Sequence, residues 1–527
     1  MDRLAGEYFA YLAREFPCLC LQDEFIHFPR VEAARENWFR GAALEAAVMG
    51  EAAARTGAWL VRLEKLAPGL TEPEARAEAA ILGQSLRSVG REFSPGGPWE
   101  RDPFLYLKTA CLAWAPALSR AERLSREELS RIPELLHRVA LIFRRGRDQV
   151  RRLTQPGRLL LQPAFAEARE FFEQVVPAFL SENCPLSEAR SRLGEVSLEL
   201  NRFQEQLEAL APDPDFALGE GGLAKILEES WGWTGGLERA EEFLQEELEE
   251  SLAALAAQAA QGGRPWPELV DACSSGDNPG EIYTLYRQEV ARLTQFWQES
   301  PDLPPLRGRV EVAPTPVYLR SLRSSASYAA PSGWGDEAPG YFYITEGLED
   351  WGHHCRHHRF LSAHETIPGH HFLDAWRLSL TRPVPRQYES PLFYEGWASY
   401  AETLLLTSGY LTEDRDRLVG WQRRLWRALR GRADLELQRG RWSLEEALSQ
   451  LARVGYPEAT AKRQVLHLAL APGYQLCYTL GLKEILRLKE TYAPALGRRR
   501  FHEVLLSGGE LPFSWVEKRL RAAGGRS

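Results

Sequence analysis

The feature that most constrains this chain is a short histidine-rich stretch, HETIPGHH, at residues 364–371. It reads as the metal-binding pattern H-E-x-x-H with two additional residues before the second histidine. In the plain pattern the two histidines lie on one face of a helix, about 6 Å apart along its axis, and bind one zinc ion. The glutamate after the first histidine then serves as general base towards the metal-activated water. Here Pro368 stands where the second histidine is required.

Helical geometry narrows the ways in which this stretch can bind a metal. On an ideal helix His370 lies about 120° away from the face of His364, whereas His371 lies nearly in line but roughly 10 Å away. Pro368 cannot donate a backbone hydrogen bond, and Gly369 tolerates unusual dihedral angles. The sequence therefore predicts a bulge at Pro-Gly that absorbs two residues and brings His370 to the second ligand position, with His371 as the alternative.

A second stretch, PLFYEGWASYAE at residues 391–402, supplies two carboxylates on a predicted helix. Glu395 and Glu402 are seven residues apart, so they share one helical face among apolar and aromatic neighbours. Burying two carboxylates is costly unless a cation pairs with them, and a zinc ion held by two histidines is a suitable cation. The alternative is a pair of surface glutamates.

A third stretch, PGYQLCYTLG at residues 472–481, places Tyr474 and Tyr478 four residues apart on one predicted helical face. A tyrosine hydroxyl near zinc can donate to the oxyanion that forms during peptide hydrolysis. The spacing alone is equally typical of two tyrosines in a helical core.

Three alternating segments before the histidine stretch predict a small β-sheet, at residues 308–312, 325–328 and 340–345. An edge strand beside a zinc site can pair with the extended backbone of a substrate, although a hairpin that only caps the core fits the pattern as well. A carboxypeptidase would also need a cation for the terminal carboxylate of its substrate. The candidate substrate-binding residues are Arg320, Arg323, Tyr328 and Tyr343.

Four histidines at 353, 354, 357 and 358 form two pairs with a spacing of four residues, which could bind a metal on a helix. No acidic residue lies among them to complete a catalytic site. We interpret them as a solvated or substrate-facing histidine face.

The rest of the chain predicts a mainly α-helical protein. Of its 527 residues, the first 300 show helical periodicity without a catalytic motif. We therefore predict a helical scaffold lobe at 1–300 and a metal-binding catalytic region at 301–527, intertwined without an independent linker. Residues 120–153 are one of the stretches with helical periodicity.

Charge and cysteine content restrict the partners and the compartment. The net charge of −9, with mixed signs, argues against a nucleic-acid partner. No run of 18 apolar residues predicts a membrane span, and the first residues lack the apolar core of a signal peptide. Seven scattered cysteines are typical of reduced thiols. We expect a cytoplasmic protein, and the oligomeric state is left open.

Together, the stretches HETIPGHH, EGWASYAE, PGYQLCYTLG and FHEVLLSGGELP resemble a bacterial family of candidate metallopeptidases, number 885 among the domains of unknown function. The resemblance is clear from about Gly340 to Leu511 and faint but collinear through the helical first half. Such proteins are similar in fold to the carboxypeptidase Taq family of gluzincins. The resemblance thus implies a two-lobed, helical, zincin-like body with a deep cleft and a small sheet next to the metal site.

The resemblance also assigns roles to residues. It implies one Zn²⁺ ion on His364, His370 and Glu395, with Glu365 as the general base. It further implies that Glu402 holds a ligand histidine, and it favours Tyr478 over Tyr474 as the residue that stabilises the oxyanion.

Two positions depart from the family pattern. Leu373 replaces a glutamine that many members carry, and His467 stands where members often have an arginine. The metal-binding residues are unaffected, but the substrate preference of the family is not transferable. The sequence therefore predicts a zinc-dependent peptidase of carboxypeptidase or oligopeptidase type. The alternatives are a helical binding or scaffold protein with a relic metal site, and a hydrolase of non-peptide amides.

Overall fold

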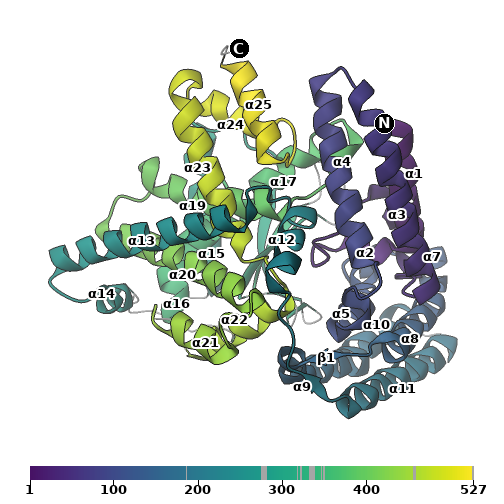
Figure 1. The fold of residues 1–527 in the computed structure, drawn as a ribbon. Coiled ribbons are helices and arrows are strands. Elements are labelled where there is room, and N and C mark those ends of the chain that lie inside the picture. Colours follow the sequence, from purple (N-terminus) through teal and green to yellow (C-terminus); the bar gives the residue numbers. More distant parts are fainter. Residues whose placement is uncertain are drawn as a thin grey trace. The chain divides into compact units, whose positions relative to one another are not determined.

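The computed structural model describes residues 1–184, 187–273, 282–316, 319–320, 323, 325–331, 339–345, 347, 351–454 and 458–524. Within these residues the protein is mainly helical, with one sheet of two strands and one of three, which confirms the predicted mainly α-helical class with a small sheet (Figure 1). None of the described helices is both long enough and apolar enough to cross a membrane.

The chain divides into two compact units. The first consists of Met1–Phe216 with Pro316–Leu322, and the second of Ala217–Thr315 with Arg323–Ser527. Residue 300, at which the sequence changes from purely helical to mixed character, lies inside the second unit.

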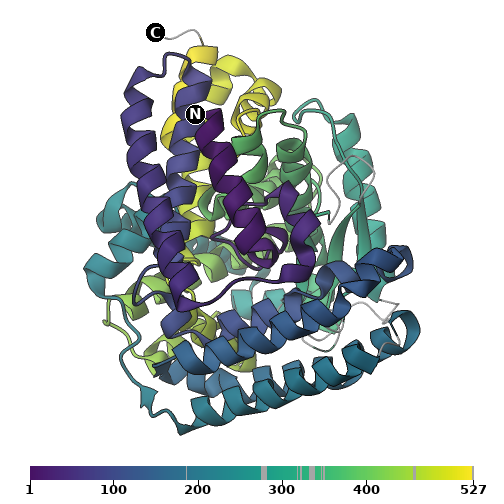
Figure 2. The same cartoon turned by 90° about the vertical axis from the view of Figure 1, so that its right-hand side faces the viewer.

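The first unit is a helical bundle with one two-residue parallel strand pair, β1 with β2. Figure 2 shows its long helices, among which α8 and α11 run side by side. Gly146 of α8 makes this approach possible, because a Cβ there would lie 2.7 Å from the ring of Phe203 on α11. The elements are α1 (Asp2–Glu15), α2 (Pro17–Leu21), α3 (Ala46–Leu66), α4 (Pro73–Glu92), α5 (Pro103–Leu112), α6 (Ala115–Leu118), α7 (Arg126–Ser130), α8 (Ile132–Gln149), β1 (Leu153–Thr154), α9 (Gln155–Glu170), α10 (Val176–Asn183), α11 (Ser187–Ala209) and β2 (Pro212–Asp213).

The stretch of helical periodicity at 120–153 is divided into two helices. The structure has α7 and α8 there, with a new start at Ile132. Pro133 occupies the first turn of α8, where the missing N–H has no intrahelical partner to lose.

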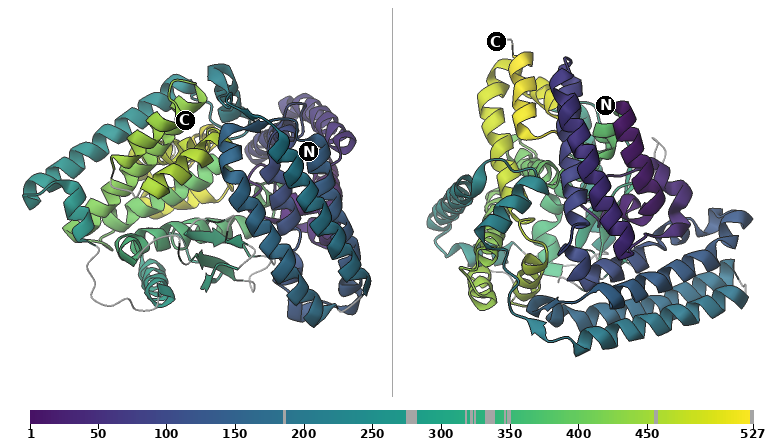
Figure 3. Two further views of the ribbon diagram at one scale, coloured as in Figure 1. Left: turned by 90° about the horizontal axis from the view of Figure 1, so that it is seen from below. Right: turned by 45° about the vertical axis from the view of Figure 1, so that its right-hand side comes forward.

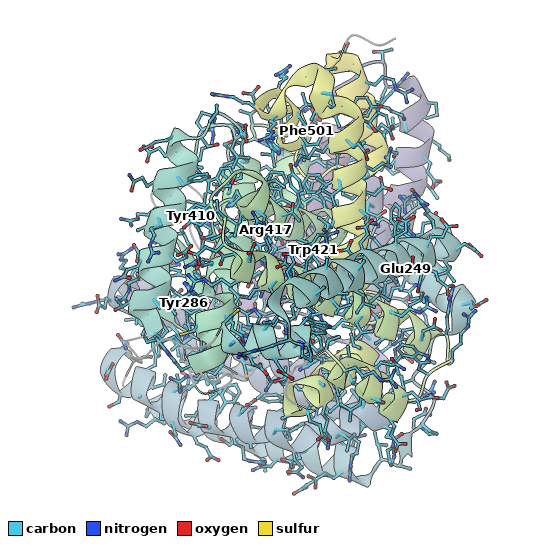
Figure 4. All side chains as sticks on the ribbon, turned by 90° about the vertical axis from the view of Figure 1, so that its left-hand side faces the viewer. Glu249, Tyr286, Tyr410, Arg417, Trp421 and Phe501 are labelled. Carbon is cyan, nitrogen blue, oxygen red and sulfur yellow. The ribbon has the colours of Figure 1, made fainter. Side chains whose placement is uncertain are left out.

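The second unit contains the remaining helices and the three-stranded sheet. Its long helix α13 packs along α20, and Arg424 of α20 donates to Glu247 of α13 at 2.6 Å. Figure 4 labels Glu249 and Trp421 on these two helices. The elements are α12 (Gly219–Glu229), α13 (Gly236–Gly262), α14 (Trp266–Ala272), α15 (Ile282–Glu299), β3 (Val310–Pro314), β4 (Ala326–Ala329), β5 (Gly340–Ile344), α16 (Trp351–Glu365), α17 (His370–Leu378), α18 (Pro383–Gln387), α19 (Pro391–Thr407), α20 (Asp414–Gln438), α21 (Leu444–Ala452), α22 (Glu458–Leu470), α23 (Leu476–Leu496), α24 (Arg498–Leu506) and α25 (Phe513–Ala523).

The three predicted strands form one sheet in the order β3-β5-β4, with β3 parallel and β4 antiparallel to β5. Phe342 and Ile344 of β5 point to the core, where they pack with Tyr286 and Val290 of α15. The left view of Figure 3 shows the strands beside the helices of this unit. Because β4 is an edge strand, one side of its backbone faces away from the sheet.

Candidate metal centre

The histidine stretch is not one bulged helix. Helix α16 ends at Glu365 and α17 begins at His370, so the predicted bulge is replaced by a complete break. The peptide bond between Ile367 and Pro368 is cis. Gly369 lies against the end of α16, because a Cβ there would be only 1.9 Å from the carbonyl oxygen of His364. Because Gly369 lies so close to His364, the residue that follows it, His370, also lies beside His364.

Trp397 of α19 holds the break in place. Its indole Nε1 donates to the carbonyl oxygen of Pro368 at 2.8 Å, and its ring is fully buried and stacks with Phe372 of α17. The tryptophan of the EGWA stretch thus connects the helix that carries Glu395 to the turn that precedes His370.

The structure brings His364, His370 and Glu395 together, and these three residues form the only candidate metal-binding group found among the described residues. We call them the His-His-Glu group. Oε2 of Glu395 lies 3.5 Å from Nε2 of each histidine, and all three side chains are buried. The two imidazole rings stand 4.7 Å apart at 80° to each other.

These distances fit a zinc ion. Two ligand atoms that are each about 2.1 Å from a tetrahedral ion lie about 3.4 Å from one another. Oε2 of Glu395 has no hydrogen-bond partner among the described residues, and a buried carboxylate oxygen in that state is costly. Burial acts to raise the pKa of Glu395, but the adjacent His364 and His370 hold it well below its ordinary value. A cation at this point would complete the arrangement.

His371 points elsewhere. Its Nδ1 lies 3.5 Å from the hydroxyl of Tyr328, and its ring fills the space over Gly308 and Gly340. Burial lowers the pKa of His371 to about 4. Of the two adjacent histidines, only His370 reaches the group.

Glu402 lies behind His364, as the resemblance implies. Its Oε1 is 3.1 Å from Nδ1 of His364, while Nε2 of the same ring faces Glu395. Arg423 and Arg427 of α20 both pair with the same carboxylate, at 2.7–2.8 Å for Arg423. Burial acts to raise the pKa of Glu402, but the two arginines keep it well below its ordinary value.

Tyr474 and Tyr478 both lie near Glu395, although they do not share a helical face as predicted. Tyr474 precedes α23, in a turn whose N–H groups at Gly473 and Gln475 donate to Asp434. The hydroxyl of Tyr474 donates to Oε1 of Glu395. The ring of Tyr478 stacks on His364 at 6.2 Å and 10°. Burial and the charge of Glu395 raise the pKa of both tyrosines well above the ordinary value, so both stay protonated.

The close approach of α19 and α23 brings these tyrosines to Glu395. A Cβ on Gly481 would lie 2.2 Å from the carbonyl oxygen of Leu392 and 2.6 Å from Cα of Gly396. The two helices therefore cross backbone to backbone, one residue after Glu395 and three after Tyr478.

The general-base candidate, Glu365, contacts the edge strand. Its Oε2 accepts a hydrogen bond from the backbone N–H of Tyr328 at 2.8 Å. Burial raises the pKa of Glu365 to about 7.

The remaining substrate-binding candidates differ in position. The guanidinium of Arg323 donates through Nη1 to the carbonyl oxygen of Tyr328 at 2.8 Å and lies 5.5 Å over the ring of Tyr343. Tyr343 in turn stacks on Tyr341 at 5.5 Å and 3°. Arg320 is exposed and belongs to the segment that groups with the first unit.

The histidine face at 353–358 differs from our interpretation, because His354, His357 and His358 are buried rather than solvated. Nδ1 of His354 pairs with the hydroxyl of Tyr286 at 2.9 Å, and His358 bonds to backbone carbonyl groups of its own helix. The contact between His354 and Tyr286 joins α16 to α15.

Sequence reasoning missed several residues of the site. Arg423 and Arg427 are four residues apart on a predicted helix, but α20 carries so many arginines that this spacing is not distinctive. The ring of Tyr394 stacks on His370 at 3.9 Å and 15°, and its position next to Glu395 was a usable signal. Of the two departures from the family pattern, Leu373 is buried and His467 is exposed on α22.

Comparisons with known proteins agree with this fold. A family model described as "Bacterial protein of unknown function (DUF885)" matches residues 42–520. A candidate lipoprotein of unknown function from Shewanella oneidensis has a similar structure, with a TM-score of 0.71, 17% identity, and coverage of 92% of this chain and 96% of that chain. A candidate lipoprotein from Colwellia psychrerythraea gives a TM-score of 0.73 at 16% identity, over 100% and 99% of the two chains. No curated protein matches the chain.

Proposed function

The chain belongs to the DUF885 family of bacterial proteins of unknown function, and from the geometry of its His-His-Glu group we propose that it is a zinc-dependent peptidase. The observation that carries this proposal is the position of Oε2 of Glu395, 3.5 Å from Nε2 of both His364 and His370. Glu365, adjacent to the first ligand, supports catalysis over a structural role, because a purely structural zinc site has no need of a base.

In this proposal His364, His370 and Glu395 hold one zinc ion. Bound there, zinc supplies Lewis acidity and lowers the pKa of a water molecule towards ~7. The carboxylate of Glu365 would accept a proton from this water molecule. At the same time the oxygen of the water molecule would bond to the peptide carbonyl carbon. Glu365 then returns the proton to the amide nitrogen as the C–N bond breaks.

The surrounding residues hold the reacting groups in position. Glu402 fixes the tautomer of His364, and Tyr474 orients Glu395 through Oε1. Tyr478 is protonated and stacks on His364, and we assign to it the donation of a hydrogen bond to the developing oxyanion.

The test is hydrolysis of a mixed peptide library by the zinc-loaded protein and by the Glu365→Gln variant. We expect the variant to lose about 10²- to 10⁴-fold in kcat while it retains its metal content, because only the base is removed. Glu445→Gln, at an exposed site on α21, is the matched control and should leave the rate unchanged. Equal rates for the native protein and Glu365→Gln would contradict the proposal.

The proposal includes a peptide as substrate and keeps the expected cytoplasmic location. All seven cysteines are free, as in proteins of a reducing compartment. The two structural relatives are described as candidate lipoproteins, which favours a location outside the cytoplasm for them. Fractionation of cells that produce the full-length protein distinguishes the two locations.

A further inference from the structure

A buried carboxyl group on α20 binds the backbone on both sides of Tyr474. Oδ1 of Asp434 accepts a hydrogen bond from the N–H of Gly473 at 2.9 Å, and Oδ2 accepts one from the N–H of Gln475 at 3.1 Å. The residue between these two donors is Tyr474, whose hydroxyl donates to Oε1 of Glu395. Asp434 therefore holds the turn from which this hydroxyl reaches Glu395.

The position of Asp434 is costly for a carboxyl group. The side chain is fully buried, and among the residues that the structure describes it forms no ion pair. Burial raises the pKa of Asp434 to about 8, although the two N–H groups act to lower it. An asparagine has one acceptor oxygen, whereas a carboxyl group presents a separate oxygen to each N–H group. The two hydrogen bonds to the turn are thus what the carboxyl group supplies at this position.

The turn itself does not follow from the repeat of α23. Gly473 has a φ of 78°, in the left-handed region, and a Cβ there would lie 2.9 Å from Nε1 of Trp231. The same Nε1 donates to the carbonyl oxygen of Pro472 at 3.0 Å, and the indole ring meets the ring of Tyr474 edge-on at 5.6 Å. The direction of Tyr474 therefore depends on contacts from Trp231 and from Asp434.

We infer that Asp434 is a positioning residue for the metal centre: it holds the turn at residues 473–475 so that Tyr474 orients Glu395, and it thereby sets the affinity for zinc. This inference rests on the proposed function, because Glu395 is a zinc ligand only in that proposal. The described hydrogen bonds of Asp434 are with the turn alone, so its effect on the metal passes through Tyr474.

One face of α20 then supports two of the three proposed ligands. Arg423, Arg427 and Asp434 are separated by four and by seven residues, so their side chains lie on the same side of the helix. The two arginines pair with Glu402, the partner of a ligand histidine. Asp434 holds the turn that carries the partner of Glu395. The helix supplies no proposed ligand itself, but it fixes the groups behind two of them.

Zinc affinity, measured by competition with a chelator, tests the inference in a double-mutant cycle. We expect Asp434→Asn to weaken zinc binding by about 10-fold, as the loss of a group that orients a ligand does. In the Tyr474→Phe background the same change should cost no more than about twofold, because the residue that carries the effect is already altered. A helix cap without a role at the metal centre would not produce this dependence on Tyr474.

Asp102→Asn in the first unit is the matched control. The carboxylate of Asp102 also accepts a backbone hydrogen bond at the start of a helix, from the N–H of Phe104 at 2.9 Å. This variant should lose a comparable cap and keep the zinc affinity of the native protein.

Hydrogen exchange of the metal-free protein gives a readout that depends on neither zinc nor turnover. Asp434→Asn should speed exchange at the N–H groups of Gly473 and Gln475, whereas Tyr474→Phe should leave it unchanged. If Asp434→Asn does not fold, Asp434→Ser is used in the same measurements, since its hydroxyl can still accept from one of the two N–H groups. Unchanged exchange in a folded Asp434 variant would show that the carboxyl group does not hold the turn, and would overturn the inference.

The remaining outcomes separate this inference from the function on which it rests. Equal zinc affinities of the native protein and Asp434→Asn would overturn the inference while the peptidase proposal stands. Losses that multiply in the double variant would also overturn it, because Asp434 would then act independently of Tyr474. Absence of zinc binding by the native protein would contradict the proposed function, and the inference with it.

Discussion

At the scale of single residues, the two tyrosines near Glu395 have different contacts and so predict different losses. Tyr474 donates to Oε1 of Glu395, and Tyr478 stacks on His364. If the proposed zinc site is correct, Tyr474→Phe should weaken zinc binding by about 10- to 100-fold, because Glu395, a ligand in that proposal, loses the group that orients it. Tyr478→Phe should keep the zinc affinity and lower kcat by about 10²- to 10³-fold, as the loss of an oxyanion donor does.

Zinc affinity is measured by competition with a coloured chelator, and kcat by peptide hydrolysis of the fully loaded variants. The two variants are each other's control, since each removes one buried hydroxyl near the same carboxylate. Identical effects of the two substitutions on both quantities would show that the roles assigned to the tyrosines are wrong.

The local sequence predicted most residues of the candidate metal centre, but not the contacts that hold these residues in position. The grouping of His364, His370 and Glu395 was predictable because two histidines and a glutamate in this order are a residue set that zinc chemistry favours. Whether His370 or His371 joins the group depends on the approach of Gly369 to the end of α16. This approach cannot be predicted from the helical periodicity of the sequence. The partners of Glu402, 21 and 25 residues further along the chain, depend on how α20 packs.

At the scale of elements, the crossing of α19 and α23 sets the distance between Glu395 and the two tyrosines. Gly396 and Gly481 meet at this crossing without side chains between them. Gly481→Ala should force the helices apart and destabilise the protein by about 1–3 kcal/mol, since its Cβ would collide with backbone atoms. It should also weaken zinc binding, because Tyr474 would move away from Glu395.

Thermal unfolding and chelator competition measure these two effects. Gly194→Ala on α11 is the matched control, because a Cβ there meets nothing within 4 Å. In an exposed helix interior this change should stabilise the protein by up to about 1 kcal/mol. A Gly481→Ala variant as stable as the native protein would contradict the backbone contact.

Helix and strand positions were predictable where the periodicity was unbroken, as for α11 and the three strands of the second unit. Two interruptions of helical stretches, at α7–α8 and at α16–α17, lie at prolines. Pro133 marks a helix start and Pro368 a full break, and at each position the sequence pattern continued across the proline. Tertiary contacts decide there whether the helix bends or ends.

At the scale of the whole molecule, stability should depend on pH through a largely buried pair in the first unit, His27 and Glu92, whose side chains are 19% and 13% exposed. Nε2 of His27 lies 3.5 Å from Oε1 of Glu92. Burial raises the pKa of Glu92 from 4.5 to about 7 and lowers the pKa of His27 from 6.5 to about 3. Both groups are therefore neutral in the folded protein over most of the range between pH 3 and 7.

The two shifts act in opposite directions. As pH rises from 4.5 to 7, unfolded Glu92 loses a proton that the folded protein keeps, so the free energy of unfolding falls by up to about 3 kcal/mol. As pH falls from 6.5 to 3, His27 in the unfolded chain gains a proton that it does not bind in the folded protein. The free energy of unfolding therefore also falls towards acid pH. Between pH 4.5 and 6.5 the two slopes oppose each other in the native protein.

Urea unfolding at a series of pH values tests the contributions of Glu92 and His27 to the free energy of unfolding. Glu92→Gln should leave only the His27 contribution, so that stability declines towards acid below pH 6.5. His27→Gln should leave only the Glu92 contribution, so that stability declines towards pH 7. Parallel pH profiles for the two variants would contradict the assigned shifts.

The break between α16 and α17 has a consequence for how related sites are recognised. In the plain motif the helical repeat fixes the number of residues between the histidines. Here a close contact takes the place of that spacing, since only a residue without a side chain fits against the carbonyl oxygen of His364. A search pattern for such centres should therefore hold the glycine before the second histidine invariant and let the length and composition of the insert vary.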